Sequence, residues 1–145
     1  MTSFFVPGTP APQGSKRYLG NGVMIESSKR VKPWRADIRA AAMQAFKQPL
    51  TGPIRLDLLF VLPRPKSHYG TGRNAHKLKD SAPQHHIQKP DLDKLVRAVG
   101  DALSGVAYHD DSQVVGGAHM KRWSDGASDR AGVHITVVPV KEVAA

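Results

Sequence analysis

Residues 54–62 carry the sequence IRLDLLFVL, and this stretch decides how the rest of the chain can fold. Apolar residues alternate with Arg55 and Asp57 at first, and from Leu58 onward the run is apolar on both faces. A run that becomes apolar throughout is typical of a strand with other elements on both sides. We therefore expect residues 54–62 to form the central strand of a sheet, ended by Pro63 and Pro65.

Apolar periodicity on either side of this strand predicts the remaining elements. Helical spacing predicts two main helices, at residues 33–46 and from about Asp91 to Gly105. Further strands are expected at residues 3–6, 113–123 and 133–140, with a hairpin across the Gly20-Asn21-Gly22 turn. This order and the length of 145 residues indicate one compact α/β (α+β) domain over residues 1–145, with a mixed β-sheet, two main helices and a long basic loop.

Composition excludes several classes of protein. The chain has no cysteine, which excludes disulfides, thiolate zinc sites and cysteine nucleophiles. Its longest apolar run, residues 58–62, is far shorter than the roughly 20 residues that span a membrane, so no membrane partner is expected. The two tryptophans, Trp34 and Trp123, are expected in the core.

Charge is distributed unevenly along the chain. The 21 Lys+Arg and 12 Asp+Glu give a net charge of +9, which favours a polyanion such as nucleic acid as the partner. Residues 1–89 hold 15 basic and 4 acidic residues, whereas residues 90–111 hold 2 basic and 5 acidic residues. Carboxylates repel phosphates, so a surface that only binds phosphate has no use for this acidic segment. A metal-dependent site that acts on phosphates, in contrast, needs such a group of carboxylates.

Residues 64–89 lack a regular apolar pattern and are expected to form a long, mobile basic loop within the domain. They contain six Lys/Arg, one Asp and four of the seven histidines. Basic residues here and near the N-terminus are candidate contacts to a DNA backbone; the alternative is a solubilising surface. Tyr69 is a candidate for stacking on an unpaired base. The basic candidates are Lys16, Arg17, Arg64, Lys66, Arg73, Lys77, Lys79 and Lys89.

Five aspartates between residues 91 and 111 allow two interpretations. In the first, Asp91 caps the second helix, Asp93, Arg97 and Asp101 form an exposed row of ion pairs, and the acids at 110–111 belong to a turn. In the second, some of the acids converge, because only about seven residues join this helix to the next strand. Carboxylates about 4 Å apart repel by roughly 4 kcal/mol at an effective dielectric of 20, so a cluster requires protons or a cation. An all-oxygen set suits Mg²⁺ or Mn²⁺.

Three segments carry a resemblance to a known family. They read KPDLDKL at residues 89–95, DALSG at residues 101–105 and DDSQV at residues 110–114. Their order and spacing resemble the signature of the RusA family, which are Holliday-junction resolvases common in phages and prophages. The resemblance extends over most of the chain through PGTP at residues 7–10 with Lys16-Arg17, RPKSHY at residues 64–69 and SAP at residues 81–83.

The resemblance implies a homodimeric, Mg²⁺-dependent endodeoxyribonuclease, with Mn²⁺ able to substitute. Such an enzyme resolves four-way junctions or other branched DNA by paired symmetric nicks. It implies a role in DNA recombination and repair, in the cytoplasm of a bacterial cell or a phage-infected host.

The resemblance also assigns the acids. Asp91, Asp93 and Asp111 match the family's essential acids and metal ligands, and Asp110 lies beside them as a further candidate ligand. Arg97 stands where the family usually carries a catalytic lysine, so it is a candidate catalytic cation. Arginine keeps the positive charge but is not interchangeable with lysine as a compact donor.

A second class of function stays open on the sequence, namely a non-catalytic basic module that binds branched or single-stranded DNA. An intact acid set disfavours that alternative. The His85-His86 pair suggests an HNH-type nuclease or a metal site, but no Asn/His partner pattern follows it.

Overall fold

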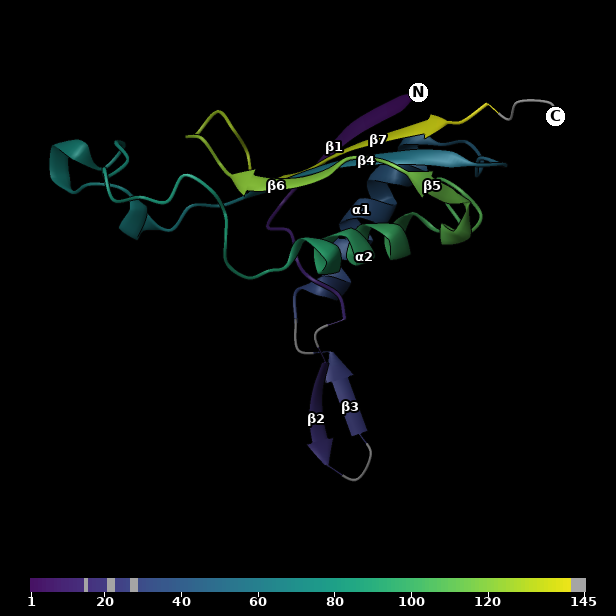
Figure 1. Ribbon diagram of the computed structural model, residues 1–145, viewed down its shortest axis with the longest axis horizontal. Coiled ribbons are helices and arrows are strands. Elements are labelled where there is room, and N and C mark those ends of the chain that lie inside the picture. The colour runs from purple at the N-terminus through teal and green to yellow at the C-terminus, as the bar shows by residue number, and fades with distance from the viewer. Residues whose placement is uncertain (15, 21–22, 27–28, 142–145) are drawn as a thin grey trace.

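A computed structural model describes residues 1–14, 16–20, 23–26 and 29–141 of the chain (Figure 1). For residues 16–19 and 23–26 the description covers the backbone alone. Within these ranges, no helix is long and apolar enough to cross a membrane.

The central strand is β4 (Ile54–Leu62), as predicted. On one side it pairs antiparallel with β7 (Gly132–Pro139), which pairs in turn with β1 (Thr2–Pro7) at the edge of the sheet. On the other side it pairs parallel with both β5 (Val114–Gly116) and β6 (His119–Trp123). The result is a five-stranded mixed sheet in the order β1-β7-β4-β5, with β6 also on β4, which confirms the expected fold class.

The single strand expected at residues 113–123 is divided in two, which corrects that prediction. Gly117 separates β5 from β6 and has φ +147°. A Cβ on Gly117 would lie 1.8 Å from the Leu56 carbonyl oxygen, so the backbones approach more closely there than a side chain allows. The next residue, Ala118, donates its N–H to the Asp57 carboxylate at 2.8 Å. The partly exposed carboxylate of Asp57 therefore replaces a backbone acceptor where the strand ladder is interrupted.

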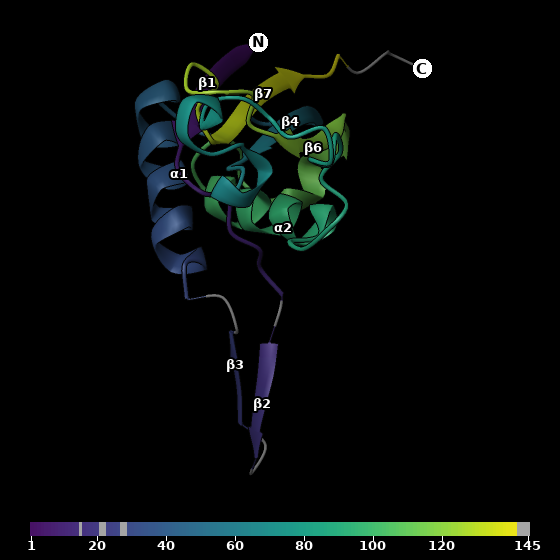
Figure 2. The same cartoon turned by 90° about the vertical axis from the view of Figure 1, so that its left-hand side faces the viewer.

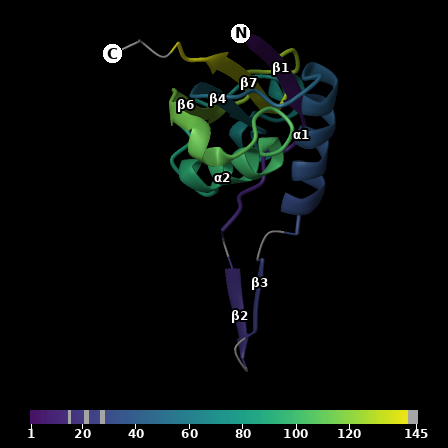
Figure 3. The same ribbon diagram turned by 90° about the vertical axis from the view of Figure 1, so that its right-hand side faces the viewer.

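Two helices pack on one side of this sheet. They are α1 (Val31–Ala45) and α2 (Leu92–Leu103), close to the predicted bounds. Figures 2 and 3 show α2 beneath the sheet, with α1 flanking α2 on the β1 side. The apolar stripe of α2 includes Leu95, Val99 and Leu103, which are fully buried. Burial of each such side chain stabilises the fold by about 1.5–3 kcal/mol, so α2 is fixed against the sheet by one face and leaves the other exposed.

The hairpin expected near residue 20 is formed by β2 (Lys16–Gly20) and β3 (Val23–Glu26), which pair antiparallel. Figure 1 shows it extending away from the sheet on the helix side. Two residues of its expected turn, Asn21 and Gly22, lie outside the described residues.

Residues 64–89 contain two short 3-10 helices, Lys66–His68 and Gly72–Asn74, and no longer element. An isolated bridge between Tyr69 and Leu78 closes the tip, and residues 71–80 are all exposed. Figure 1 shows this loop projecting beyond β6, away from the packed body of the domain. Its mobility stays a prediction.

Candidate active site on the second helix

The N-terminus of α2 presents two of the predicted acids. Asp91 is the N-cap residue, with φ −70° and ψ 143°, and its side chain makes no capping hydrogen bond. Asp93 follows in the first helical turn, where the helix dipole favours negative charge. The Asp91 carboxylate lies 3.7 Å from Lys94 Nζ and is 52% exposed. Both acids therefore face water at the positive end of the helix.

Arg97 lies one turn after Asp93 on the exposed face of the helix. Its Nη2 is 3.8 Å from Asp93 Oδ2, and the two side chains are 60% and 67% exposed. Exposed i, i+4 pairs contribute about 0.3–0.5 kcal/mol, so the fold does not depend on this contact. The pair matches one half of the ion-pair interpretation, and it leaves both charged groups accessible to a ligand. The other half is wrong, because Asp101 pairs with Arg35 of α1 at 3.4 Å.

The N-terminal loop of residues 8–14 crosses this face of α2. The Gln13 N–H donates to the Lys94 carbonyl at 3.0 Å, and Arg35 Nη1 donates to Gln13 Oε1 at 2.6 Å. Gly14 lies against Arg97, because a Cβ on Gly14 would be 2.7 Å from Arg97 Nη1. The loop thus forms one wall beside Arg97.

Asp111 approaches the same helix from the turn that follows it. Its carboxylate packs on Gly100, because a Cβ on Gly100 would lie 3.0 and 3.1 Å from the two oxygens. The fully buried Tyr108 donates its hydroxyl to Asp111 Oδ1 at 2.9 Å. Burial, followed by the negative charge of Asp111, raises the pKa of Tyr108 well above its usual value. The phenol therefore stays protonated at neutral pH and remains a hydrogen-bond donor to Asp111.

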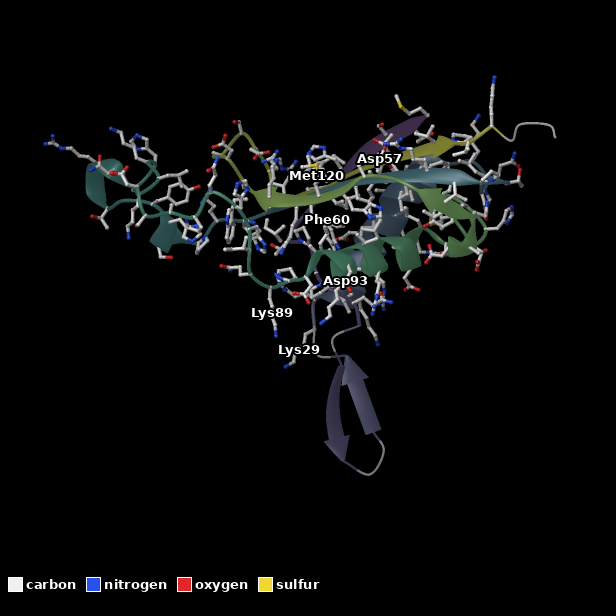
Figure 4. All side chains as sticks on the ribbon, viewed as in Figure 1. Lys29, Asp57, Phe60, Lys89, Asp93 and Met120 are labelled. Carbon is white, nitrogen blue, oxygen red and sulfur yellow. The ribbon has the colours of Figure 1, made fainter. Side chains whose placement is uncertain are left out.

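Asp93, Arg97 and Gly100 occupy positions i, i+4 and i+7 of α2, which share one face of a helix. At 1.5 Å of rise per residue, Asp93 and Gly100 are separated by about 10 Å along the axis. Asp111 lies on Gly100, so the order along this face is Asp93, Arg97, Asp111. We call this set, together with Asp91, the α2 acidic row. Figure 4 shows Asp93 on the side of the molecule from which the hairpin extends.

Asp110 has a local structural role in the turn, as the first interpretation of the acids predicted. Its carboxylate accepts a hydrogen bond from the Ser112 N–H at 2.9 Å, and Gln113 Oε1 accepts from the Asp110 N–H at 2.9 Å. The bonds from Ser112 lower the pKa of Asp110. Gln113 Nε2 also donates to the carbonyls of Leu50 and Gly52, each at 2.9 Å. This capping box anchors the turn that carries Asp111.

The arrangement of these acids limits how they can bind a metal. Across the described ranges, no three His, Asp or Glu side chains lie close enough to hold one metal ion. The acids are nevertheless the oxygen donors that Mg²⁺ prefers. Mg²⁺ commonly takes one or two protein carboxylates and completes its coordination with water and substrate phosphates. The α2 acidic row fits such a partial site, and the assignment of individual ligands stays a prediction.

The basic candidates fall into three groups. Lys66, Arg73, Lys77 and Lys79 are exposed on the projecting loop, with Tyr69 partly buried beside them, and Lys89 is exposed next to the start of α2. Arg64 is partly buried: its guanidinium lies 5.5 Å from the Trp123 ring centroid and donates to the Pro83 carbonyl at 2.8 Å. The side chains of Lys16 and Arg17 lie outside the described part of the structure.

Sequence reasoning missed three residues that position Asp111, namely Gly100, Tyr108 and Gln113. Two of them left a signal. A glycine in a helix interior is unfavourable by about 1 kcal/mol, so Gly100 indicates a close approach by another group. Asp110 followed by Gln113 has the spacing of a capping box. Tyr108 left no local signal, because its contact with Asp111 depends on how the turn packs.

Comparison with known proteins identifies the family. A family described as Endodeoxyribonuclease RusA matches residues 7–137, nearly the whole chain. The chain belongs to this family, as its sequence motifs predicted. A curated relative from Bacillus subtilis (strain 168), named Uncharacterized protein YqaN, is 35% identical over 118 residues, which cover 77% of this chain and 80% of the relative.

Membership of the RusA family gives the general activity. The family implies an endodeoxyribonuclease that acts on branched DNA junctions, and its nucleases are generally dependent on a divalent metal. The α2 acidic row is the part of this chain whose chemistry suits that activity.

Proposed function

We propose that this chain is a Mg²⁺-dependent, structure-selective endodeoxyribonuclease that resolves four-way junctions by paired symmetric nicks. Mn²⁺ would substitute for Mg²⁺. The observation that carries the proposal is the order of Asp93, Arg97 and Asp111 along one exposed helix face, in a chain of the RusA family. The side chains of Arg97 and Asp93 are 60% and 67% exposed, so a DNA phosphate can reach both of them.

In this proposal, Asp91, Asp93 and Asp111 are the candidate ligands of a divalent cation. One or two of them would bind it directly, because the described residues form no group of three ligands, and water and substrate phosphate would complete its coordination. A cation bound there would supply an activated water molecule and charge stabilisation at the scissile phosphate. Asp110 contributes by capping the turn that carries Asp111. Tyr108 acts as a positioning residue, because its hydrogen bond fixes the Asp111 carboxylate against Gly100.

Arg97 is the proposed catalytic cation. It lies between the carboxylates of Asp93 and Asp111 along the helix, and its ion pair among the described residues is the exposed one with Asp93. A phosphate that enters the row would compete with Asp93 for the guanidinium. Arginine donors placed where negative charge develops lower the barrier of phosphoryl transfer.

Positive charge around the row supports the approach of DNA. Lys29 and Lys89 lie on the same side of the molecule as Asp93, as Figure 4 shows, and both are exposed. Residues 1–89 carry 15 of the 21 basic residues. Such a surface offsets the repulsion between the carboxylates and the phosphate backbone.

Paired nicks require two active sites, and one chain has one acidic row. A four-way junction offers two equivalent strands related by a two-fold axis, which a two-fold dimer matches. We therefore include a homodimer in the proposal. The junction substrate also suggests a role in DNA recombination and repair in the cytoplasm of a bacterial cell or of a phage-infected host.

One observation favours a second candidate function. Because no three-ligand group is formed by the residues that the structure describes, the chain also suits a module that binds branched or single-stranded DNA without cutting it. The two candidates agree on binding and differ on chemistry.

A cleavage assay separates them. The full-length chain is incubated with an end-labelled synthetic four-way junction in Mg²⁺, in Mn²⁺ and in EDTA, with a linear duplex of the same sequence as control. We expect symmetric nicks in Mg²⁺ and Mn²⁺, no nicks in EDTA and little cleavage of the duplex. Junction binding without nicks in either metal would favour the binding module. Full cleavage activity in EDTA would exclude a requirement for a divalent metal.

A further inference from the structure

We propose that a pocket beside the start of α2 accepts one unpaired nucleotide of the DNA strand, and this inference rests on the proposed function. The pocket has a volume of about 360 Å³, in the size range of small-molecule sites. Its lining includes Arg30, Arg64, His86, Lys89 and Trp123. We call it the Trp123 pocket.

Two buried polar atoms belong to residues that line this pocket. Trp123 is 5% exposed and His86 is 6% exposed, and their ring centroids are 4.4 Å apart. Neither Trp123 Nε1 nor His86 Nδ1 has a hydrogen-bond partner among the described residues. Buried polar groups are normally hydrogen-bonded, so two such atoms in residues of one pocket wall point to a ligand that satisfies them.

The charges around the pocket define the kind of ligand. Arg30, Arg64 and Lys89 contribute three positive charges, and none of the described lining residues is acidic. Burial, and then the positive charge of Lys121, lower the pKa of His86, so its ring is neutral at pH 7. The positive charges therefore suit a phosphate, and the unpartnered indole N–H and neutral imidazole of the lining residues suit a polar ring. A nucleotide combines these two features.

The position of the pocket relates it to the α2 acidic row. Lys89 and Pro90 line the pocket and directly precede Asp91, the N-cap of α2. Lys121 Nζ donates to the carbonyls of Gln88 and Pro90 at 2.8 and 3.0 Å, which fixes this wall. A nucleotide in the pocket would therefore belong to the same strand region as a phosphate on the row.

This placement gives a physical basis for selecting branched DNA. A base must leave its stack to enter the pocket, and the free-energy cost is smallest where the base is already unpaired. At the branch point of a junction the base pairs lack a stacking neighbour on one side, so a base there leaves its stack at a lower cost than a base inside a linear duplex. The pocket would thus favour junctions without reading a long sequence.

Fluorescence of 2-aminopurine tests the proposal without any cleavage step. The full chain is titrated, in EDTA, into junctions that carry 2-aminopurine at each branch-point position in turn, and into the matching linear duplex. We expect a saturable rise in fluorescence at one branch-point position and none in the duplex. Nicking in Mg²⁺ is measured separately, so a cleavage failure with an intact fluorescence signal rejects the nuclease and not the pocket.

Matched variants localise the signal. Trp123→Phe removes the indole N–H. We expect it to raise the Kd measured from the fluorescence titration about three- to tenfold, the equivalent of one hydrogen bond. Trp34→Phe makes the same change at another buried tryptophan with an unpartnered Nε1, outside the pocket, and should leave the response unchanged. If Trp123→Phe fails to fold, Lys89→Gln replaces it, with the exposed Lys47→Gln as its charge control.

Free deoxynucleoside monophosphates provide the last arm. We expect millimolar concentrations of these nucleotides to lower the 2-aminopurine fluorescence of the bound junction slightly, by competing for the pocket. Binding of the free nucleotides with no branch-point signal would overturn it, as would equal responses of Trp123→Phe and Trp34→Phe or of Lys89→Gln and Lys47→Gln.

Discussion

The hydroxyl of Tyr108, whose ring is fully buried, donates a hydrogen bond of 2.9 Å to Asp111 Oδ1 at the surface of the domain. The same carboxylate packs on Gly100 of α2. A buried donor and a helix backbone thus hold one acid of the α2 acidic row from two sides, and both contacts can be tested separately.

Tyr108→Phe removes the hydrogen bond and keeps the buried ring. We expect nicking of a four-way junction to fall by about 10- to 100-fold, the range seen when a group that orients a metal ligand is removed. Junction binding should stay within about twofold. Single-turnover cleavage and a binding titration measure the two effects. If Tyr108 acts through Asp111, adding Tyr108→Phe to Asp111→Asn should cause no further loss.

Gly100→Ala places a methyl group against the Asp111 carboxylate. A Cβ at 3.0–3.1 Å from both oxygens forces the acid to move, whereas alanine is better than glycine in a helix by about 1 kcal/mol. We expect an unchanged or higher thermal midpoint together with at least a tenfold loss of nicking. A variant that is equally stable and fully active would show that the position of Asp111 does not matter.

The connection between β6 and β7 predicts a dependence of stability on acid pH. Asp129 accepts hydrogen bonds from both Arg122 Nη groups, and this contact, followed by the Asp125 N–H, holds its pKa below the usual 3.8. A lowered pKa in the folded state adds stability above the unfolded pKa, and that stability is lost as pH falls through the folded value. Denaturant unfolding between pH 5 and pH 2 should show this loss. In the Asp129→Asn variant, the free energy of unfolding should fall less steeply between pH 5 and pH 2.

Salt dependence tests the projecting loop. Replacing Lys66, Arg73, Lys77 and Lys79 by Ala should weaken binding to all DNA and flatten the log–log salt dependence by roughly 0.9 for each phosphate that the loop no longer neutralises. Junction preference should survive better than affinity. Arg64 is left in place, because it packs on Trp123 and lines the Trp123 pocket, so its replacement would mix two effects. An unchanged slope in the fourfold variant would make the loop a solubilising segment.

The sequence predicted the central strand and both helices, because residues 54–62 and the stripe of Leu95, Val99 and Leu103 have unambiguous apolar periods. It did not predict the division at Gly117, which depends on contact with Leu56 in a neighbouring strand. A local apolar pattern predicts a single helix or strand, so it does not predict which strands pair or where their backbones come into contact.

The same limit applies to the candidate site. The acids at the start of α2 follow from local spacing, and the RusA family follows from the motifs. The location of Asp111 does not, because Gln113 anchors its turn to the carbonyls of Leu50 and Gly52, some sixty residues away. Tyr108 reaches Asp111 only because its ring is buried in the assembled core.

The nicking rate of Asp93→Asn and Asp111→Asn variants on a four-way junction in Mg²⁺ tests the central claim most directly. Each substitution removes one negative charge from the row and keeps the shape of the side chain. We predict that each lowers the rate by at least about 100-fold, the scale of loss of one group that stabilises a transition state. Junction binding should be equal or tighter, because a charge that repels phosphate is gone. Nicking within about threefold of the unaltered chain in both variants would contradict the account.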